Sequence, residues 1–192
     1  MPVIAVVLAG GVSRRFGRDK LTAPLAEGDA GRLGSLEAVR AACEGAGLAV
    51  VCAGGPGGIP DTPGVGGPLG GLLGVMEVLP DTDLLLLAGD LPCLTPADVA
   101  WLVAAHRGDG VTAVTLGPGL GPEPLAAVYP AALQGALRAF AAAGGRSLRR
   151  FLEAAPALAL RVPADRRAFE DFDTEAALEA LGLRLAAPGQ AD

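Results

Sequence analysis

The segment from Leu8 to Lys20, LAGGVSRRFGRDK, holds the residue types and spacing best suited to chemistry in this sequence. Its adjacent glycines, Gly10 and Gly11, allow the backbone to approach a phosphate closely and to point several N–H groups at it. The segment is neither a Walker A loop, which requires Gly-Lys-Ser/Thr, nor a dinucleotide fingerprint, whose glycine spacing differs. It predicts a polyphosphate-binding loop, and the simpler alternative is a tight turn between a strand and a helix. The positive charges that would hold phosphate oxygens are Arg14, Arg15, Arg18 and Lys20.

Lys20 is the only lysine among the 15 basic residues of the chain, and all the others are arginines. A chain with this bias keeps a lysine where a compact, mobile ammonium group matters. Chance retention on a solvated loop is the alternative. We therefore expect Lys20, together with Arg15, to neutralise charge on a reacting phosphate.

Two aspartates are candidate ligands of a magnesium ion. Asp90 directly follows the apolar run Leu84–Gly89. A carboxylate packs poorly there but can bind a hard cation. The alternative is that Asp90 caps the following turn. Magnesium favours one or two carboxylates plus the phosphates of a substrate. Asp173 is the second candidate, although it and Asp171 both precede a helix predicted to begin at Thr174, and either could cap that helix.

Other conspicuous residues are expected to be structural. His106, the only histidine, lies at the end of a predicted helix and is expected to interact with the helix dipole. With a single histidine, the sequence predicts no Ser/His or Cys/His nucleophilic arrangement. Trp101 is expected in the core. The glycine-rich segment 117–121 has no basic residues nearby and is expected to be a surface loop.

The order of the predicted elements is typical of a mostly parallel sheet with helices on both faces, a three-layer α/β/α fold. Val3–Leu8 is a near-continuous aliphatic run, as expected for a strand that is covered on both faces. Gly54–Gly67 is too long for a simple connection and is a candidate binding loop. Further strands are predicted at Leu48–Ala53, Leu84–Gly89, Val111–Leu116, Pro124–Val128 and Leu158–Val162. Helices are predicted after an N-cap at Ser35, at Leu69–Leu79, after Thr95, and at Ala131–Ala143, Ser147–Ala154 and Thr174–Leu181.

The carboxyl ends of the first three long strands carry the candidate site. In an open parallel sheet, a ligand binds beyond this edge. The residues that follow these ends include the glycines of the first segment, the Gly54-Gly55 pair and Asp90. The sequence therefore predicts one site, with the phosphate-binding loop on one strand and the candidate metal ligand on another.

Length, charge and cysteine content limit the class of protein. A chain of 192 residues fits one large domain, predicted over residues 1–187, and the polar end at 188–192 is expected to be flexible. A net charge of −6 argues against a nucleic-acid binder. No apolar run is long enough to span a membrane, and the N-terminus has no export signal. The three cysteines lack metal-type spacing, which favours reduced thiols and a cytoplasmic location.

Motifs along nearly the whole chain resemble, in the right order, the molybdenum cofactor guanylyltransferases of MobA type. The resemblance implies a Rossmann-like nucleotidyltransferase domain, with a nucleotide-binding half at residues 1–100 and an acceptor-binding half at residues 101–187. The motifs are LAGGVSRRFGRDK at Leu8–Lys20, GGPLGG at Gly66–Gly71, GDLPCLTPADV at Gly89–Val99, PEPLAAVYP at Pro122–Pro130 and FEDFDTEAAL at Phe169–Leu178.

The family transfers GMP from GTP to molybdopterin, uses magnesium and releases pyrophosphate. Carried over by position, Lys20 would contact the phosphates, and Asp90 would contact both GTP and the metal. Asp61 is the nearest match to an aspartate that contacts GTP ahead of the family's GPLxG motif. The implied nucleotide contacts are therefore Leu8, Ala9, Gly10, Gly11, Lys20, Asp61 and Asp90.

The acceptor side is implied less directly. Arg149 or Arg150 is suited to hold the phosphate of molybdopterin, and the alternative is that both are solvated positions on a short helix. The resemblance is compatible with cofactor-delivery proteins as partners and with a monomer or weak oligomer. We expect no nucleic-acid or membrane partner.

Two departures from the family concern the nucleotide and the metal. Cys52 falls where the family has an asparagine that contacts the nucleotide, and a thiol cannot replace an amide, so guanine recognition would rely on backbone groups. The family's late asparagine motif is replaced by Asp171-Phe172-Asp173, as in some related transferases.

Three alternatives stay open. One is a molybdopterin cytidylyltransferase and another is a guanylyltransferase for a different small phosphate; Gly10 and Asp19-Lys20 favour the guanylyl type. The third is a non-catalytic nucleotide-binding protein. The presence of Asp90 together with Lys20 argues against this third class, because binding alone does not need a metal carboxylate.

Overall fold

A computed structural model describes residues 2–10, 21, 25–26, 34–155, 157–163 and 167–185. Five of the predicted site residues lie outside the described residues, as does the end of the chain at 188–192; they are Gly11, Arg14, Arg15, Arg18 and Lys20.

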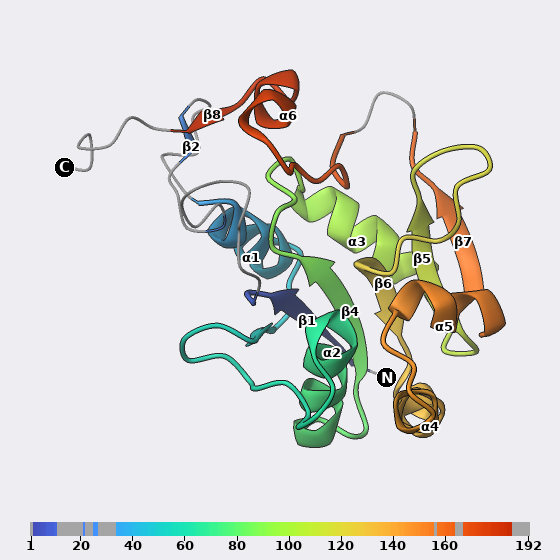
Figure 1. The fold of residues 1–192 in the computed structure, drawn as a ribbon. Coiled ribbons are helices and arrows are strands. Elements are labelled where there is room, and N and C mark those ends of the chain that lie inside the picture. The colour runs from blue at the N-terminus through green and yellow to red at the C-terminus, as the bar shows by residue number, and fades with distance from the viewer. Residues whose placement is uncertain are drawn as a thin grey trace.

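The centre of the fold is a six-stranded sheet with the order β3-β1-β4-β6-β5-β7 (Figure 1). All neighbouring pairs are parallel except those of β6, which runs antiparallel to β4 and to β5. The predicted mostly parallel sheet is therefore confirmed. Only β1 has its predicted bounds. The largest differences are in β3, which starts two residues later, and in β6, which is shifted toward Tyr129, while β4, β5 and β7 differ by one residue at one or both ends. The strands are β1 (Val3–Leu8), β3 (Val50–Ala53), β4 (Asp83–Ala88), β5 (Val111–Thr115), β6 (Ala126–Tyr129) and β7 (Ala157–Arg161).

Helices cover both faces of this sheet, which makes the predicted three-layer arrangement (Figure 1). One face packs against α1 (Ser35–Gly45) and α3 (Pro96–Ala105). The other face packs against α2, α4 and α5. The helix predicted from Ala131 starts as a short 3-10 helix. The bounds on this second face are Gly67–Val78 for α2, Ala131–Leu133 for the 3-10 helix, Gln134–Ala142 for α4 and Leu148–Ala154 for α5.

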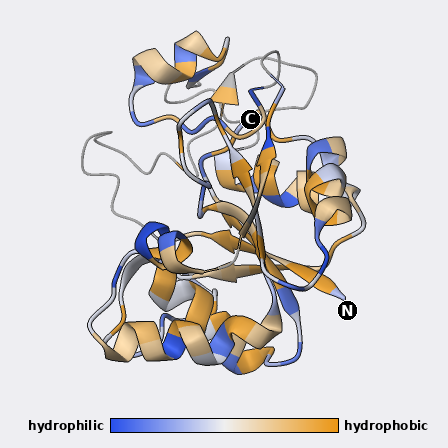
Figure 2. Cartoon of the chain, turned by 90° about the vertical axis from the view of Figure 1, so that its right-hand side faces the viewer, coloured by the Kyte–Doolittle hydropathy of each residue, from blue (hydrophilic) through white to orange (hydrophobic). Residues whose placement is uncertain are grey.

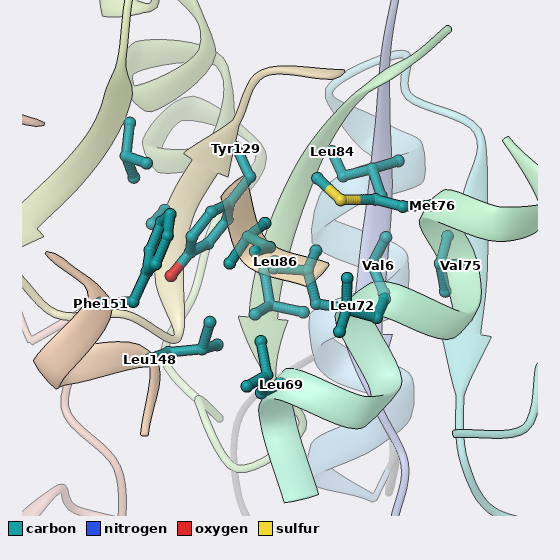
Figure 3. Packing of buried hydrophobic residues seen from close by; sticks show 14 of the residues in the cluster. Val6, Leu69, Leu72, Val75, Met76, Leu84, Leu86, Tyr129, Leu148 and Phe151 are labelled. Carbon is teal, nitrogen blue, oxygen red and sulfur yellow. The ribbon is translucent and has the colours of Figure 1, made fainter. Parts of the chain in front are cut away.

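Strand β4 shows why the chain folds into these layers. Its four consecutive leucines are all fully buried, and they alternate between the two faces of the sheet. Leu84 and Leu86 belong to the cluster under α2, while Leu85 and Leu87 belong to the cluster under α1. Figure 2 shows the hydrophobic strands of the sheet, and Figure 3 shows the first of these clusters. A continuous apolar run is what a strand needs when both of its faces are covered.

A small unit stands beside the sheet (Figure 1). It pairs β2 (Leu25–Ala26) with β8 (Arg184–Leu185) and carries α6 (Glu175–Ala180). The sequence did not predict these two strands, because two residues are too few to show any periodicity. Phe172 is fully buried here with Leu25 and Leu178. None of the helices in the described part of the chain has the length and apolar character that a membrane crossing requires.

Candidate active site

The carboxyl ends of three strands meet at one point of the sheet edge. Leu8, the last residue of β1, pairs with Ala53 at the end of β3 and with Ala88 at the end of β4. The Ala9 N–H donates to the Ala53 carbonyl at 2.9 Å, which extends the pairing beyond β1. The segments that follow these ends therefore start side by side, as predicted.

The backbones of the first two segments are in close contact. A methyl group added at Gly54 would lie 3.2 Å from the Gly10 Cα. Gly54 also has a φ of 71°, in the region that favours glycine. Ala9 and Gly10 thus stand against the start of the Gly54–Gly67 loop, and a larger residue at Gly54 would separate the two segments.

Asp61 reaches the same place from within that loop. Its Oδ1 atom lies 4.0 Å from a methyl group built on Gly54 and 3.5 Å from one built on Gly71 in α2. The carboxyl group is exposed to solvent. The structure therefore brings Asp61 next to Gly54, whose backbone contacts Gly10, although 51 residues separate Asp61 from Gly10 in sequence.

Glycines of α2 explain how the loop can lie so close. A methyl group on Gly70 would meet the Val65 carbonyl oxygen at 1.8 Å, and one on Gly74 would meet the Pro60 carbonyl oxygen at 2.2 Å. The Thr62 N–H donates to the Gly70 carbonyl at 3.1 Å. The glycines cost helix stability but let the backbone on both sides of Asp61 rest on the helix.

Asp90 follows the end of β4 and is half-buried. The residue before it, Gly89, is buried, and a methyl group there would lie 2.7 Å from the Leu8 carbonyl oxygen. The prediction that Ser35 caps α1 is wrong. The N-cap is Gly34, which makes no side-chain cap bond, and the Ser35 hydroxyl donates instead to the Gly89 carbonyl at 2.8 Å. The hydroxyl is directed across the fold because the Gly89 carbonyl is buried and needs a donor.

The Pro122–Pro130 motif returns to this edge because β6 is antiparallel to β4. The Ala88 N–H donates to the Leu125 carbonyl at 3.0 Å, so Leu125 lies beside the end of β4. The Tyr129 hydroxyl, at the far end of the motif, donates to the Pro124 carbonyl at 3.0 Å. Burial of Tyr129 raises the pKa of its hydroxyl, and the nearby Glu123 carboxylate raises it further. Figure 3 shows the Tyr129 ring beside Phe151 in the core.

Glu123, in the same motif, forms an ion pair with Arg149 at 3.0 Å. The guanidinium remains 54% exposed, while the carboxylate is 24% exposed. Arg149 is therefore oriented by a partner, unlike a fully solvated surface arginine. The sequence alone did not single out Glu123 or Tyr129, and their only signal was their place within the motif.

The segment with Asp171 and Asp173 is attached to the chain just after Asp90. Phe169 is buried in the cluster that contains Leu91 and Leu94. The N-cap of α6 is Thr174, whose side chain accepts from the Ala177 N–H at 3.1 Å. The helix thus begins as predicted, with both aspartates in the three residues before its cap.

Cys93 gives a second indication that the two segments are neighbours. Burial raises the pKa of its thiol; the Glu170 carboxylate raises it further and the Arg167 guanidinium lowers it. Both charged residues lie just before Asp171, so the 167–170 segment is close to the turn after Asp90.

His106 lies at the opposite edge, where β4 begins. It follows α3, as predicted, but its ring contacts Asp83 through Nε2 at 3.2 Å and Thr112 through Nδ1 at 3.0 Å. The histidine has neither a serine nor a cysteine among these partners, and the hydroxyl beside it belongs to a threonine. Thr112 is only 2% exposed, however, so no substrate can reach its hydroxyl. The Asp83 carboxylate also accepts from the Ala131 N–H at 2.9 Å, so this group has a structural role.

Sequence comparison decides the family. Residues 5–160 match the MobA-like NTP transferase domain. The chain belongs to this family. The MobA-like chain is therefore a nucleotidyltransferase, and transferases of this family usually use a divalent metal ion. A search of curated proteins found no match.

Solved structures share the fold of this MobA-like chain. Molybdopterin-guanine dinucleotide biosynthesis protein A from Archaeoglobus fulgidus has a TM-score of 0.64 at 19% identity, over 92% of this chain and 95% of its own. A nucleotidyl transferase from a Methanothermobacter species has a TM-score of 0.68 at 19% identity, over 94% and 95%. The 2-C-methyl-D-erythritol 4-phosphate cytidylyltransferase from Thermus thermophilus has a TM-score of 0.60 at 19% identity, over 95% and 99%. At these identities the likeness establishes the fold alone.

The residues at the edge suit a divalent metal held jointly with a substrate. Within the described ranges, no group of three or more His, Cys, Asp or Glu side chains could hold a metal ion. The described part of the chain therefore has no metal site formed entirely by protein side chains. Magnesium is usually held by one or two carboxylates together with substrate phosphates and water, and the single half-buried carboxylate of Asp90 fits that mode.

Proposed function

We propose that this MobA-like transferase moves GMP from GTP to the phosphate of molybdopterin and releases pyrophosphate. The observation that carries the proposal is the register at the sheet edge, where Leu8 pairs with both Ala53 and Ala88. This register brings a glycine backbone suited to phosphates next to a carboxylate suited to a metal. The resemblance of the motifs to guanylyltransferases supplies the nucleotide and the acceptor.

The donor nucleotide is assigned to the half formed by residues 1–100. The backbone of Leu8, Ala9 and Gly10, with Gly11, would line the nucleotide. Asp61 is exposed beside Gly54, which contacts Gly10, and its two carboxylate oxygens can accept from the N1–H and the 2-amino group of guanine. Cytosine has only its 4-amino group to donate at the corresponding edge. Asp61 therefore supplies a guanine preference that does not depend on an amide at Cys52.

The reaction requires positioning and charge neutralisation, not a protein nucleophile. An oxygen of the acceptor phosphate attacks the α-phosphorus in line, a new P–O bond forms, and the bond to the bridging oxygen of pyrophosphate breaks. Lys20 and Arg15 are assigned the role of neutralising the negative charge that spreads over the phosphate oxygens during the reaction. Asp90, with Asp173 as second ligand, would hold magnesium, which when bound supplies further neutralisation of the phosphate oxygens.

The acceptor is assigned to the half formed by residues 101–187. Arg149 projects a half-exposed guanidinium that Glu123 orients, and Arg150 precedes the buried Phe151 on the same helix. A guanidinium held in this way can bind a phosphate through two N–H groups. This side of the edge therefore suits a phosphorylated acceptor.

A cytidylyltransferase is the second candidate function. Cys52 takes the place of the family's nucleotide-contacting asparagine, and the fold is shared with a cytidylyltransferase. Titration of the four nucleoside triphosphates with and without magnesium, followed by pyrophosphate release in the presence of molybdopterin, tests both candidates. Magnesium-dependent preference for GTP supports the proposal. Preference for CTP, or binding without pyrophosphate release, contradicts it.

A further inference from the structure

The first turn of α1 contacts the residue that precedes Asp90. The Ser35 side chain is fully buried, and its hydroxyl donates to the Gly89 carbonyl at 2.8 Å across 54 residues of sequence. The carbonyl of Gly89 and the N–H of Asp90 belong to one planar peptide group. A bond that fixes one therefore fixes the orientation of the other.

We propose that Ser35 is a positioning residue for Asp90, so that its hydroxyl sets the direction from which the Asp90 carboxylate reaches the metal and the nucleotide. This inference rests on the proposed function for its catalytic consequence. Its structural part, the control of the Gly89–Asp90 peptide by Ser35, can be tested without any substrate.

The surroundings of Gly89 leave little room for another arrangement. A methyl group there would lie 2.7 Å from the Leu8 carbonyl oxygen, 3.1 Å from the Leu36 side chain and 3.4 Å from the Leu21 side chain. The turn is therefore enclosed by β1 on one side and by α1 on another. Because water has little access, the hydroxyl of Ser35 cannot be replaced easily by a solvent molecule when it is removed.

The same turn of α1 also holds the chain that follows the phosphate-binding segment. The Leu36 N–H donates to the Leu21 carbonyl at 3.1 Å, and Leu21 is the residue directly after Lys20. One helical turn thus anchors Leu21 and, through Ser35, the residue before Asp90. We infer that the turn keeps Leu21 and Gly89 in register, because both are bonded to adjacent residues of one rigid element.

The experiment compares Ser35→Ala and Ser35→Cys with Thr112→Val. The cysteine is close to serine in volume but is a weak donor, so it separates the loss of the hydrogen bond from the loss of packing. Thr112→Val removes another buried hydroxyl bond, at the far edge of the sheet, and serves as the matched control. Each variant is measured for stability, for GTP KM and kcat, and for the magnesium concentration that gives half-maximal activity.

Both Ser35 variants are expected to lower kcat and the apparent magnesium affinity by about 10- to 100-fold, the usual effect of removing a group that orients a metal ligand. The GTP KM, measured at saturating magnesium, should change much less. Thr112→Val should lose stability and keep its kcat. The inference is overturned if the Ser35 variants lose only stability, or if Thr112→Val lowers kcat as much as they do.

An NMR measurement on the unliganded protein separates this inference from the proposed function. In Ser35→Ala, the Asp90 amide resonance should shift and its hydrogen exchange should become faster, while in Thr112→Val it should stay unchanged. An unaltered Asp90 amide in Ser35→Ala would overturn the positioning role whatever the activity. If the wild-type protein transfers no nucleotide but the Asp90 amide responds as expected, the proposed function fails and the control of the peptide by Ser35 stands.

Discussion

Replacing Gly74 by alanine tests how the structure places Asp61. Gly74 lies inside α2, where a methyl group would come within 2.2 Å of the Pro60 carbonyl oxygen. The Pro60 backbone must then recede by about 1 Å to reach an ordinary contact. Pro60 is directly bonded to Asp61, so the carboxylate must move away from Gly10 and Gly54 with it.

The two consequences of Gly74→Ala have different magnitudes. Overpacking costs about 1–3 kcal/mol, and alanine returns about 0.5–1 kcal/mol through its better helix propensity, so the net loss of stability should be about 0–2.5 kcal/mol. Loss of a charge-assisted hydrogen bond to the base costs about 1.5–3 kcal/mol. GTP binding should therefore weaken about 10- to 100-fold, since about 1.4 kcal/mol corresponds to a factor of ten.

Calorimetric titration with GTP and CTP, together with urea unfolding, measures both effects. Gly135→Ala is the control, because Gly135 also lies in a helix but a methyl group there meets nothing within 4 Å. This control should gain stability and bind GTP normally. Asp61→Asn should weaken GTP binding without a change in stability. Normal GTP affinity in Gly74→Ala would refute the argument that the α2 glycines place Asp61 on the nucleotide.

Four further variants address the remaining parts of the site. Lys20→Ala should lower turnover by about 10²- to 10³-fold without unfolding the protein, as expected for the loss of one preorganised charge. Near-normal steady-state turnover would mean that the lysine is retained by chance and has no role in the reaction. Asp90→Asn should abolish magnesium-dependent GTP binding because the amide loses the charge that a hard cation prefers, and Asp173→Asn should act more weakly. A magnesium titration that gives wild-type affinity in Asp90→Asn would remove Asp90 from the metal site. The double change Arg149→Ala with Arg150→Ala should weaken acceptor binding and leave GTP affinity almost unchanged. Separate equilibrium titrations of the two ligands measure this. Equal losses of affinity for both would contradict the division of the chain into a nucleotide-binding half and an acceptor-binding half.

Continuous apolar runs and glycine pairs were enough to predict the layers of this fold. Val3–Leu8 and the leucines after Asp83 became buried central strands, because a strand covered on both faces needs apolar residues at every position. The edge where these strands end could also be predicted, since parallel strands bring their carboxyl ends together. Gly10 and Asp90 could therefore be placed at one edge from the sequence pattern alone.

The direction of β6 could not be predicted from the sequence and is determined by the tertiary structure. Its short apolar run would fit a parallel or an antiparallel position equally well. The antiparallel pairing with β4 is what returns Leu125 to the end of that strand, and with it Glu123, two residues earlier in the chain. The sequence pattern carries no information on this pairing, because it depends on a contact between segments far apart in the chain.

Hydrogen-bond partners that are far apart in the chain also could not be predicted from the sequence. Ser35 has the residue type of an N-cap, yet its hydroxyl bonds to a carbonyl 54 residues away, and the ring of His106 bonds to Asp83. A local pattern describes only the donors and acceptors within a few residues, whereas a buried polar group takes whichever partner the packed fold brings to it. The sequence by itself therefore determined the strands, their covered faces and the edge that carries the site, and the tertiary structure decided which side chains hold that edge in place.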